Sequence, residues 1–133
     1  MRRIDVKFID KAADICKTIP AIKNKHRVVA IVTNGKNKVL SVGYNSYTKT
    51  HPKQKELALL CNIHHKAYLH AEISALVKLK DSGAKNIYVV RLWKDETFAL
   101  AKPCRICELA IKEAGLEKIF YTVYNGIKQK MII

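Results

Sequence analysis

Long apolar runs are missing from this sequence. Residues 1–20, MRRIDVKFIDKAADICKTIP, are interrupted by Asp5, Asp10 and Asp14 and lack the apolar segment of a secretory signal. No window elsewhere approaches the length that a membrane-spanning helix requires. We therefore expect a cytoplasmic protein in a reducing compartment, with no membrane partner. There, the 4 cysteines are expected to be thiols or metal ligands and not disulfides.

Acidic residues are also scarce. The chain has 11 Asp and Glu against 25 Lys and Arg, which gives a net charge of +14. This balance favours an anionic partner such as a nucleotide or a nucleic acid, although a solvated basic surface without a ligand would have the same composition. Repeats, linkers and low-complexity tracts are absent as well. With 133 residues, of which 49% are hydrophobic, the sequence predicts a single domain over residues 1–133.

Hydrophobic periodicity divides the chain into helices and strands. Apolar residues recur at helical spacing from Ile4 to Ile19, and Pro20 ends that helix. RVVAIV, at 27–32, is a continuous apolar run that predicts a central strand buried on both faces, and a turn at Asn34-Gly35 leads into a second strand. A long loop with at most one short helix follows at 45–69, and then a helix from His70 to Ser82 with Gly83 as its C′ residue. We expect a strand at 86–92, an irregular segment at 93–102 and a helix at 103–115. The chain continues with a strand at 118–124 and a last antiparallel strand after the turn at Asn125-Gly126. This order predicts an α/β fold of three layers, α-β-α, around a mixed five-stranded sheet.

Two cysteines open one of the predicted helices. In PCRIC, Cys104 and Cys107 are three positions apart and lie on one side of a first helical turn. The helix N-terminus lowers thiol pKa, which helps both bind a metal ion as thiolates. In LHAEISAL, residues 69–76, His70 and Glu72 open a second helix, and His70 has the chemistry of a third ligand.

Two cysteines, one histidine and an open fourth position form a catalytic zinc arrangement. Glu72 would then lie beside the zinc-activated water without being a ligand, where a carboxylate can take and deliver a proton. The alternative is a closed structural zinc site with Cys61, His64 or His65 as the fourth ligand, which would leave Glu72 without a role.

These motifs resemble those of the zinc-dependent cytidine deaminase superfamily, which has an H-x-E…P-C-x-x-C signature. GYNS at 43–46 matches a further element of that family, and the resemblance covers nearly the whole chain. It is strongest for the deoxycytidylate deaminases and their small phage relatives. The implied fold is cytidine deaminase-like, and the implied activity is hydrolytic deamination of a cytosine nucleotide, above all deoxycytidylate, with release of ammonia.

The resemblance also implies roles for individual residues. Glu72 would be the catalytic proton shuttle, Asn45 would hydrogen-bond the sugar, and the backbone of Ala71 would contact the base. One catalytic Zn²⁺ is implied, with the ligands His70, Cys104 and Cys107. Members of the family usually associate, so a homo-oligomer is expected.

Other residues are candidates from their position alone. Trp93 is the first candidate to stack on a base, and Tyr44 and Tyr47 are the next. A phosphate would be bound by Arg91 or by the loop after GYN, whose basic residues are Lys49, His51, Lys53 and Lys55. A second, structural zinc site is not expected, because the spacings of its potential ligands match no known pattern. Those potential ligands are Cys16, His51, Cys61, His64 and His65.

Two other functions compete with nucleotide deamination. A deaminase acting on cytosine or adenine in single-stranded DNA or RNA would fit the charge of +14, but the aromatic content is only 8% and no separate binding domain is present. A non-catalytic zinc module that binds nucleic acid would bind zinc, release no ammonia and be indifferent to Glu72→Ala.

Overall fold

The computed structural model describes residues 1–20, 26–46, 51–60, 69–80 and 83–132. Their helices and strands, in sequence order, are α1 (Arg3–Lys17), β1 (Arg27–Asn34), β2 (Val39–Tyr44), α2 (Pro52–Leu60), α3 (Ala71–Val77), β3 (Ala84–Leu92), β4 (Phe98–Ala99), α4 (Arg105–Glu113), β5 (Lys118–Val123) and β6 (Gly126–Met131). Within the described ranges, no helix is long and apolar enough to cross a membrane.

The strands form one mixed sheet in the order β2-β1-β3-β5-β6, and the short β4 pairs with β3 at its end. All neighbours are antiparallel except β3 and β5, which run parallel. A parallel pair needs a long crossover connection, and here β4 and α4 lie within it. The crossover places the N-terminus of α4 beyond the C-terminal end of β3.

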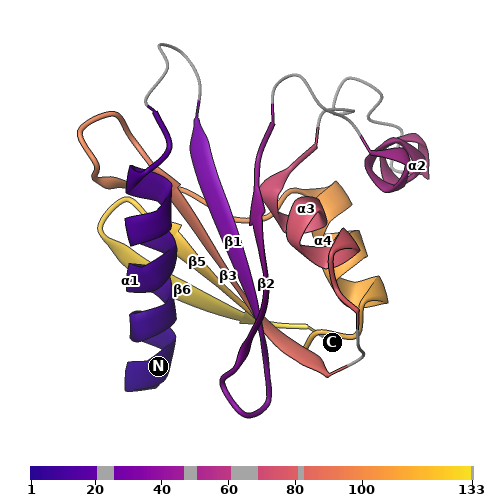
Figure 1. Cartoon of the computed structure of the whole chain (residues 1–133), viewed down its shortest axis with the longest axis horizontal. Coiled ribbons are helices and arrows are strands. Elements are labelled where there is room, and N and C mark those ends of the chain that lie inside the picture. Colours follow the sequence, from indigo (N-terminus) through magenta and orange to yellow (C-terminus); the bar gives the residue numbers. More distant parts are fainter. Residues whose placement is uncertain (21–25, 47–50, 61–68, 81–82, 133) are drawn as a thin grey trace.

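Helices cover both faces of the sheet (Figure 1). The apolar side of α1 packs on one face, in a cluster with Tyr88 and Phe120 of β3 and β5. The other face carries α3 and α4, and α2 lies outside them (Figure 1). β1 is buried along most of its length, as expected for a strand with helices on both sides.

A buried carboxylate joins α1 to the sheet. Asp5 is 1% exposed and accepts hydrogen bonds from Tyr88 Oη at 2.6 Å and from Arg2. Burial by itself would raise the pKa of Asp5, but the hydrogen bonds from Arg2 and Tyr88 more than offset it, and the pKa lies below its usual value.

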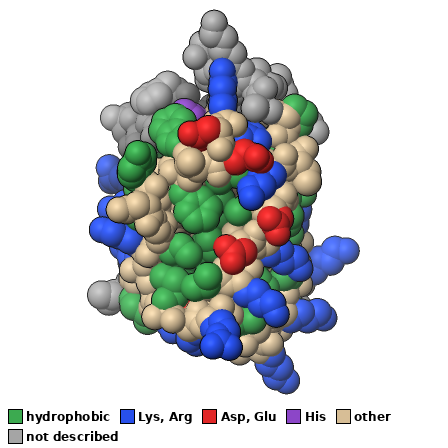
Figure 2. Space-filling model, turned by 90° about the vertical axis from the view of Figure 1, so that its left-hand side faces the viewer, with side chains coloured by type: hydrophobic (Ala, Val, Ile, Leu, Met, Phe, Trp, Pro, Cys, Tyr) green, Lys and Arg blue, Asp and Glu red, His purple; other side chains and the backbone are tan. Residues whose placement is uncertain are grey.

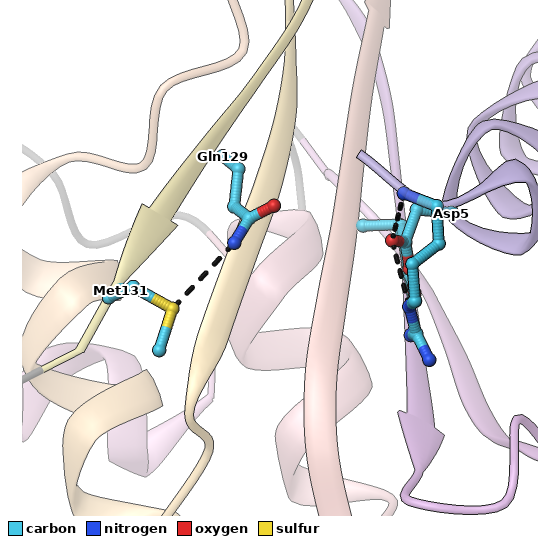
Figure 3. A network of polar contacts seen from close by, with 5 residues as sticks. Asp5, Gln129 and Met131 are labelled. Atoms are coloured by element: carbon cyan, nitrogen blue, oxygen red, sulfur yellow. Dashed lines mark hydrogen bonds and ion pairs between the residues drawn. The ribbon is translucent and has the colours of Figure 1, made fainter.

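On the outer strand β6, Gln129 and Met131 make a weaker side-chain contact at 3.7 Å (Figure 3).

Basic side chains are spread over the surface. Figure 2 shows the side of the molecule on which α1 lies, where Lys and Arg side chains are distributed widely and acidic and apolar side chains gather between them. On this side, then, the positive charge does not form the continuous stripe that a nucleic acid backbone would favour.

The predicted three-layer α/β fold is confirmed, with some changes in the bounds of its elements. The five predicted strands are present, and a sixth, β4, lies in the segment predicted to be irregular. The helix predicted from His70 to Ser82 was too long: α3 ends at Val77 with Lys78 as its C-cap. Gly83 therefore does not cap it and instead precedes β3, whereas Gly115, with φ of 80°, does follow the C-cap of α4.

Candidate active site

The first half of the site lies at the N-terminus of α3. His70 is the N-cap, with extended backbone angles of −85° and 155°, and its carbonyl accepts the first helical hydrogen bond from Ser74 at 2.9 Å. Its imidazole does not cap the helix. A histidine at this position leaves its ring free to point away from the helix axis, past the N-terminus.

The helix α3 packs directly on the backbone of β2. A Cβ atom at Gly43 would lie 2.2 Å from the carbonyl oxygen of Ala71 and 2.3 Å from the nitrogen of Ala75. Only glycine permits this approach. Ser41 adds a hydrogen bond from its Oγ to the carbonyl of Ala75 at 2.8 Å, so the strand fixes where the helix begins.

The second half of the site lies at the N-terminus of α4. Cys104 is the N-cap with an extended backbone, and Cys107 follows in the first turn and is fully buried. Pro103 immediately precedes the N-cap and is buried. The predicted placement of both sulfurs at a helix start is therefore confirmed.

The two helix N-termini bring three potential metal ligands together. His70 Nδ1 lies 3.3 Å from Cys107 Sγ and 3.6 Å from Cys104 Sγ, and all three atoms lie within 4.8 Å of one another. Zinc bonds of about 2.3 Å to sulfur and 2.0 Å to nitrogen, at tetrahedral angles, require nitrogen–sulfur separations of about 3.5 Å. The observed spacings, together with two thiols and an imidazole as donors, fit a zinc ion.

The two thiols have pKa values shifted in opposite directions. Hydrogen bonds from Cys107 and His70 lower the pKa of Cys104 to about 3. The pKa of Cys107 is raised, because its proton is held in the hydrogen bond to Cys104 and because the group is buried. Cys104 is therefore the thiol of the pair that ionises more readily.

Glu72 lies beside this cluster and is only 6% exposed. Burial raises the pKa of its carboxyl, while the charge of His70 opposes that shift. The carboxyl also interacts with the thiol of Cys107, so it lies next to the potential ligands without belonging to their group.

A pocket of about 410 Å³ opens onto the cluster, which is a size typical of small-molecule sites. His70, Glu72 and Cys104 belong to its lining, whereas Cys107 does not. The open side of the potential metal site therefore faces the pocket.

Basic residues line the same pocket. Arg91 Nη2 lies 2.8 Å from the imidazole nitrogens of His26, and Arg91 Nη1 donates to the carbonyl of Leu100 at 3.3 Å. Arg91 Nε is buried and finds no hydrogen-bond partner among the residues described. Burial and the charge of Arg91 both lower the pKa of His26, which favours a neutral imidazole. Lys102 adds a second cationic group to the lining.

Two of the predicted substrate contacts lie in this pocket. Asn45 and Ala71 line it. The Asn45 side chain is held by β1, because its Oδ1 accepts from Val28 N at 3.0 Å and its Nδ2 donates to the carbonyl of His26 at 3.1 Å. Its predicted contact with a sugar must therefore use the remaining lone pair of Oδ1 or the second hydrogen of Nδ2.

Trp93 lies outside the pocket lining and is 44% exposed. Its ring contacts the ring of His26 edge-on, with centroids 6.0 Å apart, and the guanidinium of Arg91 lies 5.3 Å from its centroid. Trp93 thus supports two lining residues, and its stacking on a base stays a prediction. Tyr44, 42% exposed, is also outside the lining, and Tyr47 is outside the described residues.

The described basic residues of the loop after GYN do not belong to the lining of this pocket. His51 and Lys53 line a different pocket, against α3 and α4, and Lys53 is paired with Glu113 at 2.8 Å. Lys49 lies outside the described residues. So do Cys61, His64 and His65, the alternative fourth ligands of a closed zinc site. Cys16 is buried in the cluster under α1, on the other face of the sheet.

Sequence reasoning missed His26 and Lys102. His26 directly precedes the strand β1, and Lys102 directly precedes PCRIC, so proximity to these features was the available signal. His26, Arg91 and Lys102 come from three separate segments of the chain and line one pocket only because these segments pack together.

Comparisons with known proteins agree with this geometry. A search of curated proteins gave no match. Among solved structures, a cytidine deaminase from Burkholderia pseudomallei is similar with a TM-score of 0.63 and 16% identity, over 98% of this chain and 93% of that one. A dCMP deaminase from the cyanophage S-TIM5, solved in complex with dCMP and dUMP, is similar with a TM-score of 0.57 and 22% identity, over 91% of this chain and 82% of that one. A cytidine deaminase from Mycobacterium leprae has a TM-score of 0.54 and 16% identity, with 91% and 88% covered. At these identities the likeness concerns the fold.

Family membership follows from the sequence itself. The family model described as the cytidine and deoxycytidylate deaminase zinc-binding region matches residues 2–123, which include both helix N-termini and the pocket between them. The chain therefore belongs to the cytidine and deoxycytidylate deaminase family.

Proposed function

We propose that this protein is a zinc-dependent hydrolase that deaminates a cytosine nucleotide, with deoxycytidylate as its substrate. The observation that carries the proposal is the meeting of three soft donors, within 4.8 Å of one another, beside the buried carboxyl of Glu72 and at the wall of a pocket. Two thiols and one imidazole leave one tetrahedral position for water, as in catalytic zinc sites.

The residues supply distinct parts of the reaction. His70, Cys104 and Cys107 would hold zinc, which lowers the pKa of a bound water to about 7. Glu72 would take one proton from the attacking water and deliver it to N3 of the cytosine ring as the water oxygen adds to C4. It would then take the remaining proton from the new hydroxyl at C4 and deliver it to the departing amine. The sum is cytosine and water converted to uracil and ammonia, with Glu72 restored.

The pocket also favours a particular orientation of substrate. The base must reach Glu72 and the metal ligands, so the buried backbone of Ala71 beside them is placed to contact it. Asn45, held against β1 by Val28 and His26, is the proposed partner of the sugar.

The position of Arg91 is an argument for a phosphorylated substrate and against an unphosphorylated nucleoside. Its guanidinium lies in the pocket lining against His26, and its buried Nε has no acceptor among the described residues. The phosphate of a nucleotide is an acceptor of the required charge. We therefore assign the phosphate contact to Arg91, with Lys102 as a second cation in the same lining.

A substrate panel tests the proposed reaction. Ammonia release would be measured with zinc-loaded protein on deoxycytidylate, deoxycytidine, cytidine, single-stranded DNA and tRNA. We expect turnover of deoxycytidylate well above the others. Turnover of DNA or RNA with a steep inverse dependence on salt would contradict the proposal, because a single phosphate contact gives only a shallow dependence.

The phosphate contact has a separate test. Arg91→Gln is expected to raise KM for deoxycytidylate by about 10- to 100-fold, as the loss of a charge-assisted hydrogen bond predicts, with little change in kcat/KM for deoxycytidine. Lys36→Gln, an equal change of charge at an exposed turn, is the matched control. Equal losses on both substrates in Arg91→Gln would assign the arginine a structural role instead.

A further inference from the structure

The backbone N–H of His70 is bonded by a side chain from another helix. Gln54, in α2, is 0% exposed, and its Oε1 accepts a hydrogen bond from His70 N at 3.2 Å. Glutamine is rarely buried to this extent, so a completely buried one in a nine-residue helix requires a partner inside the protein.

The helix α3 cannot satisfy this N–H by itself. In a capping box, the side chain of the N3 residue turns back and accepts from the N–H of the N-cap. With His70 as the N-cap, the N3 position of α3 is Ile73, which has no acceptor. The oxygen of Gln54 takes the place of that missing acceptor, from a helix that lies outside α3 and α4 (Figure 1).

The helix that carries Gln54 is itself anchored on both helices of the site. Leu57 is fully buried in a cluster with Ile73 of α3 and with Ile106 and Cys107 of α4. An ion pair at 2.8 Å joins Lys53 to Glu113 at the end of α4. Gln54 is therefore held in a fixed position relative to both sets of potential ligands.

We propose that Gln54 is a positioning residue for the metal site: by holding the backbone of His70, it sets the distance of the imidazole from the two sulfurs. The imidazole of His70 makes no cap to its own helix, and the hydrogen bond to Gln54 fixes the backbone from which the ring extends. Groups that orient metal ligands typically change metal affinity by about 10- to 100-fold when they are removed. The inference rests on the proposed zinc site but does not require the proposed substrate.

Three variants of α2 test this role. Gln54→Met has a similar length and no strong acceptor, Gln54→Glu keeps an oxygen acceptor, and Leu59→Ala, at an exposed position of the same helix, is the matched control. Zinc affinity would be measured by chelator competition, and ligand geometry by the visible spectrum of the Co²⁺-substituted protein. We expect Gln54→Met to bind zinc about 10- to 100-fold more weakly with an altered cobalt spectrum. We expect Gln54→Glu to remain closer to the wild type on both measures, and Leu59→Ala to match the wild type in zinc affinity and in cobalt spectrum.

Wild-type affinity and spectrum in Gln54→Met, or equal effects in Gln54→Met and Leu59→Ala, would overturn the assignment. A measurement on the unaltered protein avoids any problem with folding of the variants: the amide proton of His70 should exchange slowly with solvent in the zinc-loaded chain, and rapid exchange would also overturn it. Failure of the wild-type protein to bind zinc would instead contradict the proposed metal site, so the two failures are distinguishable.

Discussion

Glu72 differs from the three potential ligands in what its side chain offers. It is almost fully buried, lies against the thiol of Cys107, and stands outside the group of atoms that could share an ion. A carboxyl in that position can move a proton without contributing to metal affinity. Glu72 follows His70 by two positions, and inside a helix two such side chains would point well apart. Both can lie at the same cluster because His70 is the N-cap of the helix.

Replacement of this carboxyl separates catalysis from metal binding. Glu72→Gln is expected to retain bound zinc and thermal stability but to lower kcat by about 10²- to 10⁴-fold, the range for loss of a general acid–base group. Ammonia release and zinc content would be measured on the same preparation. Near-normal turnover would remove Glu72 from the proposed mechanism.

The cysteines provide a comparison within one chain. Cys104→Ala is expected to abolish zinc retention and to lower the melting temperature by about 5 °C or more, because metal binding contributes to folding. Cys16→Ala removes a buried thiol from the opposite face of the sheet and should keep the full zinc content. Zinc content of the purified proteins, with differential scanning fluorimetry, distinguishes the two. Full zinc content in Cys104→Ala would contradict the ligand set.

At the scale of elements, the site depends on two helix N-termini that meet. Each helix has a potential metal ligand as its N-cap, and partial positive charge at both termini favours anionic thiolates and a deprotonated water between them. The position of α3 depends in turn on its close contact with β2 at Gly43.

Gly43→Ala tests that contact. The new methyl group would lie about 2 Å from backbone atoms of Ala71 and Ala75, which cannot move without a shift of the helix. We expect the free energy of unfolding to fall by about 2 kcal/mol or more, together with weaker zinc binding, because the N-terminus of α3 would move away from α4. Gly126→Ala, where an added Cβ has nothing within 4 Å, is the matched control and should be nearly neutral in chemical denaturation. Unchanged zinc affinity in Gly43→Ala would show that α3 is positioned by other contacts.

At the scale of the whole molecule, buried groups link stability to pH. Burial raises the pKa of Cys16 from 9.0 to about 11, so the folded protein keeps this thiol neutral after the unfolded chain has ionised it. The resulting stability is present below pH 9 and is lost between about pH 9 and 11. The two-unit shift corresponds to at most about 3 kcal/mol.

Urea unfolding of wild type and Cys16→Ala at pH 8 and pH 10.5 measures this linkage. We expect wild-type stability to fall more steeply than that of the variant, since other alkaline titrations are common to both proteins. Parallel decreases would show that Cys16 does not contribute to alkaline unfolding.

Much of this molecule was predictable from local patterns. The three layers follow from the order of helical and strand periodicities. The set of potential metal ligands follows from residue types at the starts of two predicted helices. The length of α3 was not predictable in this way, because apolar residues continue past Val77 and the sequence around Ser82 and Gly83 resembles a helix end. β4 was missed because a two-residue strand has no periodicity and exists only through its pairing with β3.

The sequence alone determined which reactive groups the candidate site contains. Two thiols, an imidazole and a carboxyl lie at the starts of two helices, and both their types and their spacing are local features of the sequence. Only the tertiary structure decided which residues surround them. His26, Arg91 and Lys102 come from three segments that local periodicity does not relate, and Gln54 reaches His70 across 16 positions from another helix. These contacts arise because the elements pack closely against one another. That packing depends on the side chains along the whole of each element and not on any short motif.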